Sequence, residues 1–393
     1  MARGPAGGYD AGDMGVSAEF QFPRLERVIS GVDSVETLSE EIQRRGLTRA
    51  VLVTGRTLGT SALLDRITRH LGDRCTSIFR GARQHVPSCT VVELVRVMEQ
   101  CKADSVVSVG GGSPIDTAKA AVHTLLTAGG GVASADEGPL HIAIPTTLSA
   151  GEFTSVAGIT DDKTRIKRAV TDPRIAPRTV FTDPTVTLET PDWLWAASGV
   201  RALDHAVESI YSVRHHPLSD ALASRGLSLL VEHLPRSLST AGREQLEHRQ
   251  QCQMAAWMSV FGMTNAGFGL SHAFGHQIGP RWDVPHGITS CITLPRAMRF
   301  MASLAPERFG PIADGFGLPF DPANPGAAAS LCADRAESFI SQFNLPRRLR
   351  DAQVPADDLE TVAGIVHDIM AGAHVVDRPV ARKELASLLA DVY

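Results

Sequence analysis

The first half of the chain alternates short apolar runs with amphipathic stretches, and this alternation limits the possible folds more than any other feature. Buried strands are expected at residues 49–54, 76–79, 104–109, 141–144 and 179–182, and helices at 61–71, 91–101 and from Ser113 onward. Strands that alternate with helices build a mostly parallel sheet covered on both faces. This half is therefore predicted to be an α/β domain.

The residue pattern of the second half is different, because it has long amphipathic stretches and few runs of β-branched residues. This pattern is typical of a helical domain. Helices are expected at residues 217–233, 244–263, 328–343, 356–371 and 381–392, and a surface connection at 310–328. A chain of 393 residues exceeds what one hydrophobic core usually fills. The predicted division is a disordered tail (1–20), an α/β domain (21–192) and a helical domain (193–393), with Trp193 and Trp195 anchoring the junction.

Composition excludes several classes of function. The net charge of −5 offers no basic field for nucleic acid or for a membrane surface. No stretch approaches the roughly 18 apolar residues of a membrane span, and the first residues lack the apolar core of a signal peptide. The six cysteines include no CxxC pair, which indicates reduced thiols and a cytoplasmic protein. We expect a homodimer that acts on a small-molecule substrate.

A glycine-rich loop follows one of the predicted strands and opens a helix, in the order Gly110, Gly111, Gly112, Ser113, Pro114. Glycines let a backbone approach a pyrophosphate, and a helix N-terminus presents free N–H groups to it. Ser113 is the expected N-cap, with Asp116 completing the capping arrangement. A tight turn without a ligand is the simpler alternative.

Four histidines and one arginine in the second half form the second candidate site. Arg201 and His205 lie four residues apart, as do His272 and His276, so each pair lies on one face of a helix, and His286 follows. Imidazoles that converge from separate elements suggest a divalent metal completed by a carboxylate. One turn before His205, where that carboxylate is expected, the chain has a permanent cation, Arg201.

Five segments in this order resemble the iron-containing alcohol dehydrogenase superfamily, and most closely its maleylacetate reductase branch. They are GGGSPIDTAK (110–119), PTTLSAGEFT (145–154), RALDHAVE (201–208), GLSHAFGH (269–276) and PHG (285–287), and the similarity covers roughly residues 24–390. The resemblance implies an α/β dinucleotide-binding domain, an all-α C-terminal domain of the dehydroquinate synthase-like type, and an active site in the cleft between them.

The resemblance also implies roles for individual positions. Gly110, Gly111, Gly112 and Ser113 would hold the cofactor pyrophosphate, Thr146, Thr147 and Ser149 would line the nicotinamide end, and Lys167 would reach the ribose. The histidine metal ligands of the family fall on His205, His272 and His286, and the additional histidine near the substrate falls on His276. The aspartate ligand falls on Arg201, which puts the metal in doubt. Asp204 is expected to point elsewhere on its helix.

The tip of the second strand bears on the choice between NAD and NADP. Where NAD-preferring members of the family place an acidic residue, this chain has Gly55 followed by Arg56. A 2′-phosphate is not repelled there, and Arg56 is placed to pair with it. The alternative is that Arg56 is a solvated loop charge.

These features lead to one main hypothesis and two alternatives. The main hypothesis is an NAD(P)H-dependent reductase of a small carbonyl or enoyl-carboxylate substrate, in which Arg201 with His205, His272 and His286 replaces a metal and His276 donates a proton. The first alternative is a metal-dependent alcohol dehydrogenase with zinc or iron on three histidines. The second is a non-redox member of the same fold. For Arg201 itself, a simple salt bridge to Asp204 or Glu208 is the competing interpretation.

Overall fold

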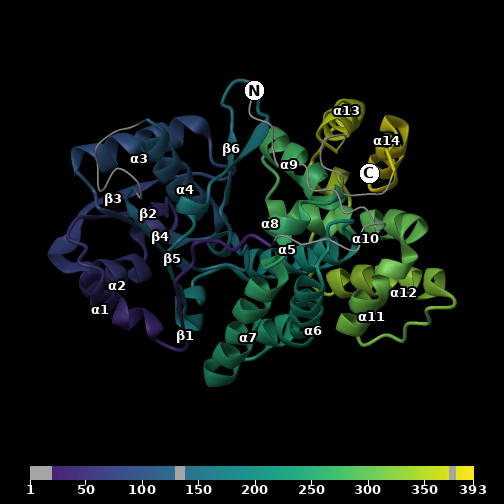
Figure 1. The fold of residues 1–393 in the computed structure, drawn as a ribbon, viewed down its shortest axis with the longest axis horizontal. Helices are drawn as coiled ribbons and strands as arrows, with labels where there is room; N and C mark the ends of the chain where they lie inside the picture. The colour runs from purple at the N-terminus through teal and green to yellow at the C-terminus, as the bar shows by residue number, and fades with distance from the viewer. Residues whose placement is uncertain (1–19, 129–137, 371–377) are drawn as a thin grey trace, which may run out of the picture.

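The computed structural model describes residues 20–128, 138–370 and 378–393. It has two parts that lie side by side (Figure 1). The first contains a six-stranded sheet with its helices, and the second is built from helices alone. The predicted α/β domain followed by an all-α domain is confirmed. The disordered tail predicted at the N-terminus lies almost wholly outside the described residues.

The sheet has the strand order β1-β8-β5-β4-β2-β3, and every pair in it is parallel. Its strands are β1 (Arg27–Ser30), β2 (Ala50–Gly55), β3 (Cys75–Ala82), β4 (Ser105–Gly110), β5 (Leu140–Pro145) and β8 (Thr179–Thr182). The chain leaves β2 toward β3 and then returns to β4 on the other side, so the direction of strand addition reverses between β2 and β4. Ligands of open parallel sheets bind at the carboxyl ends of the strands beside such a reversal.

Helices cover both faces of this sheet because its strands are apolar on both faces. They are α1 (Leu38–Arg44), α2 (Ala62–Leu71), α3 (Ser88–Gln100) and α4 (Gly112–Thr127). Val51 and Val53 of β2 pack with residues of α3 and α4, whereas Leu52 between them packs with residues of α1 and α2. This alternation is the two-residue period of a strand that is buried on both sides.

The second part is organised around α5 (Asp192–Tyr211), which is buried along nearly its whole length. Around it lie α6 (Pro217–Ser239), α7 (Gly242–Val260), α8 (Met263–Ala266), α9 (Leu270–Trp282), α10 (His286–Leu304), α11 (Gly310–Phe316), α12 (Pro325–Ser341), α13 (Leu359–Met370) and α14 (Arg382–Asp391). A helix that is buried on all sides holds its polar residues in a nonaqueous environment. Arg201, Asp204, His205 and Glu208 of α5 are therefore all buried.

A hairpin and a shared hydrophobic cluster connect the two parts. An antiparallel hairpin of β6 (Val156–Thr160) and β7 (Lys167–Thr171) leaves the sheet domain, and Arg165 in its turn donates a hydrogen bond from Nε to the Pro280 carbonyl at 2.9 Å. The largest hydrophobic cluster also crosses the junction, because it includes Ala143 and Val180 of the sheet together with Trp195. The two parts therefore share a core.

Two local predictions are wrong, and one element was missed. The segment 310–328 is not only a connection, because α11 forms within it. Trp195 is fully buried at the junction as expected, but Trp193 is 49% exposed. The hairpin of β6 and β7 was not predicted, since its strands are short and polar on one side.

Candidate active site

A cavity of about 620 Å³ lies between the two parts. Its walls include the glycine loop after β4 and the tip of β2 on one side, and α5, α9 and the start of α10 on the other. The predicted site residues that line it are Gly55, Arg56, Gly110, Gly111, Gly112, Ser113, Thr146, Thr147, Ser149, Lys167, Arg201, His205, His276 and His286. His272 does not line it and is fully buried behind it.

The glycine loop is packed so closely that side chains would not fit. Gly110 has φ +138°, a conformation open mainly to glycine, and a Cβ on Gly111 would lie 3.1 Å from the Thr147 side chain. A Cβ on Gly112 would lie 3.2 Å from Ser149 Oγ, and that hydroxyl is buried without a hydrogen-bond partner among the described residues. A close backbone approach beside an unsatisfied hydroxyl fits the phosphates of a dinucleotide.

The capping prediction for this helix is wrong in detail. The N-cap of α4 is Gly111, two residues earlier than expected, so Ser113 lies in the first turn. Asp116 makes an ion pair with Lys119 at 3.0 Å and accepts a hydrogen bond from the Gly158 backbone at 3.3 Å. The start of α4 thus leaves its first N–H groups without a capping side chain, which suits an anionic ligand.

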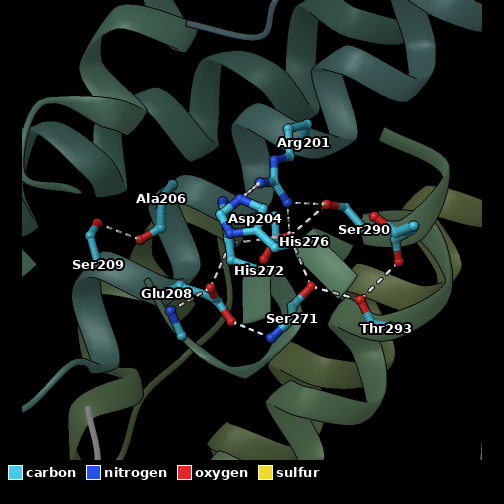
Figure 2. Close-up of polar contacts among 12 residues, drawn as sticks. Arg201, Asp204, Ala206, Glu208, Ser209, Ser271, His272, His276, Ser290 and Thr293 are labelled. Carbon is cyan, nitrogen blue, oxygen red and sulfur yellow. Dashed lines mark hydrogen bonds and ion pairs between the residues drawn. The ribbon is translucent and has the colours of Figure 1, made fainter. Parts of the chain in front are cut away.

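Arg201 extends from α5 to the cavity and is only 7% exposed. Figure 2 shows its guanidinium among side chains of three helices. One terminal nitrogen donates to Ser290 Oγ at 3.1 Å and lies 3.5 Å from an Asp204 oxygen, and the other lies 3.5 Å from His276 Nε2. Both interpretations of Arg201 are therefore realised in part: it pairs with Asp204, and it also faces the cavity.

Asp204 points into the cluster, contrary to the expectation from sequence. Its Oδ2 accepts hydrogen bonds from Ser271 Oγ at 2.8 Å and Ser290 Oγ at 2.6 Å, and lies 3.5 Å from His272 Nδ1. Asp204 does point away from its sequence neighbour His205, but its partners come from other helices. The helix α9 packs against α5, and it presents Ser271 and His272 to the side of α5 that carries Asp204.

Glu208, one turn further along α5, contacts the same nitrogen of the His272 imidazole as Asp204, at a shorter distance. Its Oε2 lies 2.6 Å from His272 Nδ1 and accepts from the Gly269 backbone, while its Oε1 accepts from the Ser271 backbone at 2.7 Å. Burial and Arg201 act to lower the pKa of His272, but Asp204 and Glu208 raise it above the ordinary value of a histidine. These two carboxylates therefore balance the charges of Arg201 and His272.

The imidazoles that reach the cavity are in the opposite situation. Burial, followed by nearby positive charge, holds the pKa of His205, His276 and His286 well below the ordinary value. All three are therefore neutral at neutral pH. The rings of His276 and His286 lie 5.4 Å apart, and His286 Nδ1 is buried without a partner among the described residues.

Lys167 on β7 is partly buried and lines the cavity. Its Nζ is 2.9 Å from His286 Nε2. Burial lowers the pKa of Lys167 to about 8, against the opposing effect of Asp116. Two cations, the buried Arg201 and the partly buried Lys167, therefore face the cavity from different elements, Arg201 beside the neutral ring of His276 and Lys167 beside that of His286.

Sequence reasoning missed two residues at this site. His85 lines the cavity at the carboxyl end of β3, and its ring lies 5.2 Å from that of His286. Its position after a predicted strand was the available signal. Phe268 forms the apolar wall beside the histidines, with ring centroids 5.3 Å from both His272 and His276. No periodic pattern marks it, because it lies in the turn before α9.

The donor set does not fit a metal on the three histidines. Within the described ranges, the only group of three possible ligands that converge is Asp204, Glu208 and His272. His286 Nε2 faces Lys167, and the Arg201 guanidinium lies between His276 and Ser290. In the converging group, His272 Nδ1 and both Glu208 oxygens are already engaged in hydrogen bonds. Asp204 and Glu208 pair with Arg201 and His272, so these carboxylates are not assigned to a metal ion.

Comparison with known proteins identifies the family of the chain. Residues 25–184 match the family model described as iron-containing alcohol dehydrogenase, and residues 195–393 match that of the C-terminal part of the same family. The chain belongs to the iron-containing alcohol dehydrogenase family. Family membership makes it an oxidoreductase at this level of description. No helix in the described part of the chain has the length and apolarity needed to cross a membrane.

Relatives within the family include both dehydrogenases and reductases. The NAD-dependent methanol dehydrogenase of Bacillus methanolicus is 30% identical over 345 residues, which is 85% of this chain and 90% of that protein. Maleylacetate reductase 2 of Cupriavidus pinatubonensis is 32% identical over 80% of this chain and 84% of its own. Among solved structures, a putative alcohol dehydrogenase from Ralstonia eutropha has a TM-score of 0.82 at 28% identity and covers 96% of this chain and 98% of its own.

Proposed function

We propose that this protein is an NAD(P)H-dependent reductase of a small carbonyl or enoyl-carboxylate substrate, similar in action to maleylacetate reductase. The observation that carries the proposal is a pair of cations, the buried Arg201 and the partly buried Lys167, that face one cavity. The two carboxylates that line the same cavity are already engaged, because Asp116 pairs with Lys119 and Glu189 accepts a hydrogen bond from the Leu63 backbone. Buried positive charge attracts an anionic substrate and stabilises negative charge that develops on oxygen. Relatives named as maleylacetate reductases support this choice.

The cofactor would lie along the glycine loop. Gly110 to Ser113 would bind its pyrophosphate through the backbone, with Thr146, Thr147 and Ser149 toward the nicotinamide. When bound, the nicotinamide supplies the hydride. Lys167 carries three donor hydrogens, so a contact with the ribose is compatible with its contact to His286.

Arg201 would bind the substrate carboxylate or the developing oxyanion. Its guanidinium is planar, permanently charged and held by Ser290 and Asp204 on one side, which leaves the edge toward His276 for the substrate. Since Arg201 donates toward His276 Nε2, the neutral ring of His276 has its hydrogen on Nδ1 and offers a second donor.

The proton that completes the reduction would come from Lys167, which lines the cavity. The Lys167 ammonium donates one hydrogen to His286 Nε2, which would hold it in place and leave its other hydrogens for the substrate. As negative charge develops on the substrate oxygen, Lys167 would give a proton to it and become a neutral amine. His276, proposed from sequence as the donor, then acts as a neutral hydrogen-bond donor, because its pKa lies well below neutrality.

A panel of substrates tests this function. Carbonyl and enoyl acids, together with their neutral esters and simple aldehydes, would be assayed with NADH and NADPH, with and without EDTA. We expect the acids to be reduced with higher kcat/KM than the esters, and EDTA to leave the rate unchanged. Preference for neutral alcohols or aldehydes, with activity lost in EDTA and restored by zinc or iron(II), would establish the metal-dependent alternative instead.

Cofactor choice is tested at the tip of β2. Arg56 is exposed at the cavity wall, and Gly55 precedes it. A Cβ on Gly55 would lie 3.4 Å from the Ala82 carbonyl, an ordinary contact, so Gly55→Asp is sterically acceptable. We expect the wild type to accept NADPH, and Gly55→Asp to raise KM for NADPH about tenfold or more while changing KM for NADH little. A wild type that already rejects NADPH contradicts this proposal.

A further inference from the structure

A second cluster of histidines lies away from the cavity, where helices α6 and α7 pack against each other. These two helices form an antiparallel pair joined by a short turn, and they lie side by side in Figure 1. His233 belongs to the last third of α6, and His248 to the second turn of α7. Neither residue lines the cavity described above, and nothing in the proposed reaction uses them.

The two imidazoles face each other through the same type of nitrogen. His233 Nδ1 lies 2.9 Å from His248 Nδ1, and the ring centroids are 5.1 Å apart. The side chains are 15% and 12% exposed, so the pair is mostly buried but open to water on one side. A contact of this length between two nitrogens requires a positive centre or a hydrogen between them, since two lone pairs repel each other.

The carboxylates around the pair determine where the ring hydrogens lie. Glu232 Oε2 is 3.8 Å from His233 Nε2, and Glu244 Oε1 is 3.7 Å from His248 Nε2. A carboxylate beside Nε2 favours the tautomer with its hydrogen on that nitrogen. Both Nδ1 atoms then present lone pairs to each other.

We propose that His233 and His248 bind a divalent transition metal ion of the zinc type through their Nδ1 atoms, with water completing the coordination. A carboxylate on the outer nitrogen of each histidine is the arrangement that orients metal-binding imidazoles in proteins. With Zn–N distances of about 2.0–2.1 Å, tetrahedral coordination places two nitrogens about 3.3 Å apart, so the rings need to separate by only a few tenths of an ångström. The ion would link α6 to α7.

Zinc alone is the probe for this site, measured by isothermal titration calorimetry on the metal-free, full-length protein. The test variants are His233→Asn and His248→Asn, which remove a ligand but keep a hydrogen-bonding side chain. His367→Asn is the matched control, because His367 is an exposed histidine on α13 with one neighbouring carboxylate, Asp368. We expect the wild type and the control to share one zinc site that each test variant lacks, and zinc to raise Tm through that site only in the first two proteins.

A fourth variant separates metal binding from a simple hydrogen bond between the rings. Glu244→Gln changes an exposed side chain and leaves both imidazoles in place. It is expected to weaken zinc binding about tenfold, as is typical when a residue that hydrogen-bonds to a metal ligand is removed. Zinc isotherms of His248→Asn and Glu244→Gln that superimpose on the wild type would overturn the proposal, as would a wild type that binds no zinc. Binding at the histidines of the cavity would persist in all these variants and is thereby distinguished.

Discussion

The Arg201 guanidinium contacts Ser290, Asp204 and His276, and its removal would affect its surroundings in different ways. Asp204 keeps its hydrogen bonds from Ser271 and Ser290, so the carboxylate stays partly satisfied. His276 loses the donor that fixes its tautomer. The cavity loses its buried cation and keeps the partly buried Lys167. The effect on activity is therefore expected to exceed the effect on stability.

Arg201→Ala is expected to lower kcat/KM for an acidic substrate about 10- to 100-fold, because a charge-assisted hydrogen bond contributes roughly 1.5–3 kcal/mol. Steady-state kinetics on the best substrate of the panel measures this. Ser290→Ala is the control, since it removes a neutral partner of Arg201 and leaves the charge in place. A harmless Arg201→Ala would mean that the residue only pairs with Asp204 on its own helix.

Lys167 should give the reduction a characteristic pH dependence. Proton donation by Lys167 requires the ammonium form, and the pKa of Lys167 is lowered to about 8. The rate of reduction should therefore be constant below this value and fall as pH rises through it. Lys167→Met should reduce kcat at neutral pH and abolish the decrease near pH 8 in the kcat profile.

The matched control is Lys163→Met, which removes an exposed lysine from the turn of the same hairpin. It should leave the kcat profile unchanged. If Lys167→Met instead raises KM for NADH while kcat and its pH profile stay as in the wild type, Lys167 serves the cofactor ribose and not proton transfer.

At the scale of elements, the proposed cofactor site depends most directly on the local sequence at the start of α4. Gly111→Val would place a branched side chain against Thr147, only 3.1 Å from the new Cβ. We expect NADH affinity to fall tenfold or more, which corresponds to about 1.4 kcal/mol, measured by nicotinamide fluorescence. Gly326→Val is the comparison, because a Cβ at Gly326 meets nothing within 4 Å. Equal NADH affinity in both variants would remove the loop from the cofactor site.

At the scale of the whole molecule, a buried arginine joins the two parts. Arg249 of α7 is 1% exposed, donates to the Thr187 carbonyl at 2.6 Å and lies 4.5 Å from the centre of the Trp195 ring. Arg249→Ala leaves that carbonyl without its donor and opens a cavity beside Trp195. We expect the free energy of unfolding, measured with denaturant, to fall by about 2–4 kcal/mol.

Arg243→Ala on the same helix is the control, because the Arg243 side chain is 92% exposed and makes only an i,i+4 pair with Glu247. Its effect should stay within about 0.5 kcal/mol. Equal stability of the two variants would show that the junction depends on the shared apolar core and not on Arg249.

The sequence by itself determined the architecture, the glycine loop and most of the residues around the cavity, although it missed His85 and Phe268. Strand periodicity and glycine placement act over a few residues, so they can be read without knowing the fold. The resemblance of five ordered segments supplied the residue positions, including the departure at Arg201. The end positions of several helices agree with the expected ones to within three residues, as for α7 and α12, whereas α6 extends six residues beyond its expected end.

Only the tertiary structure decided how the charges are paired. Whether Asp204 faces the cluster depends on how α9 packs against α5, and whether Lys167 meets His286 depends on how the hairpin lies against α10. Burial and neighbouring charges then set the protonation of each group: two carboxylates raise the pKa of His272, while burial and positive charge keep His276 and His286 beside it neutral. Such effects arise between residues distant in sequence, where electrostatic energy depends on separation and desolvation, and no local pattern contains them.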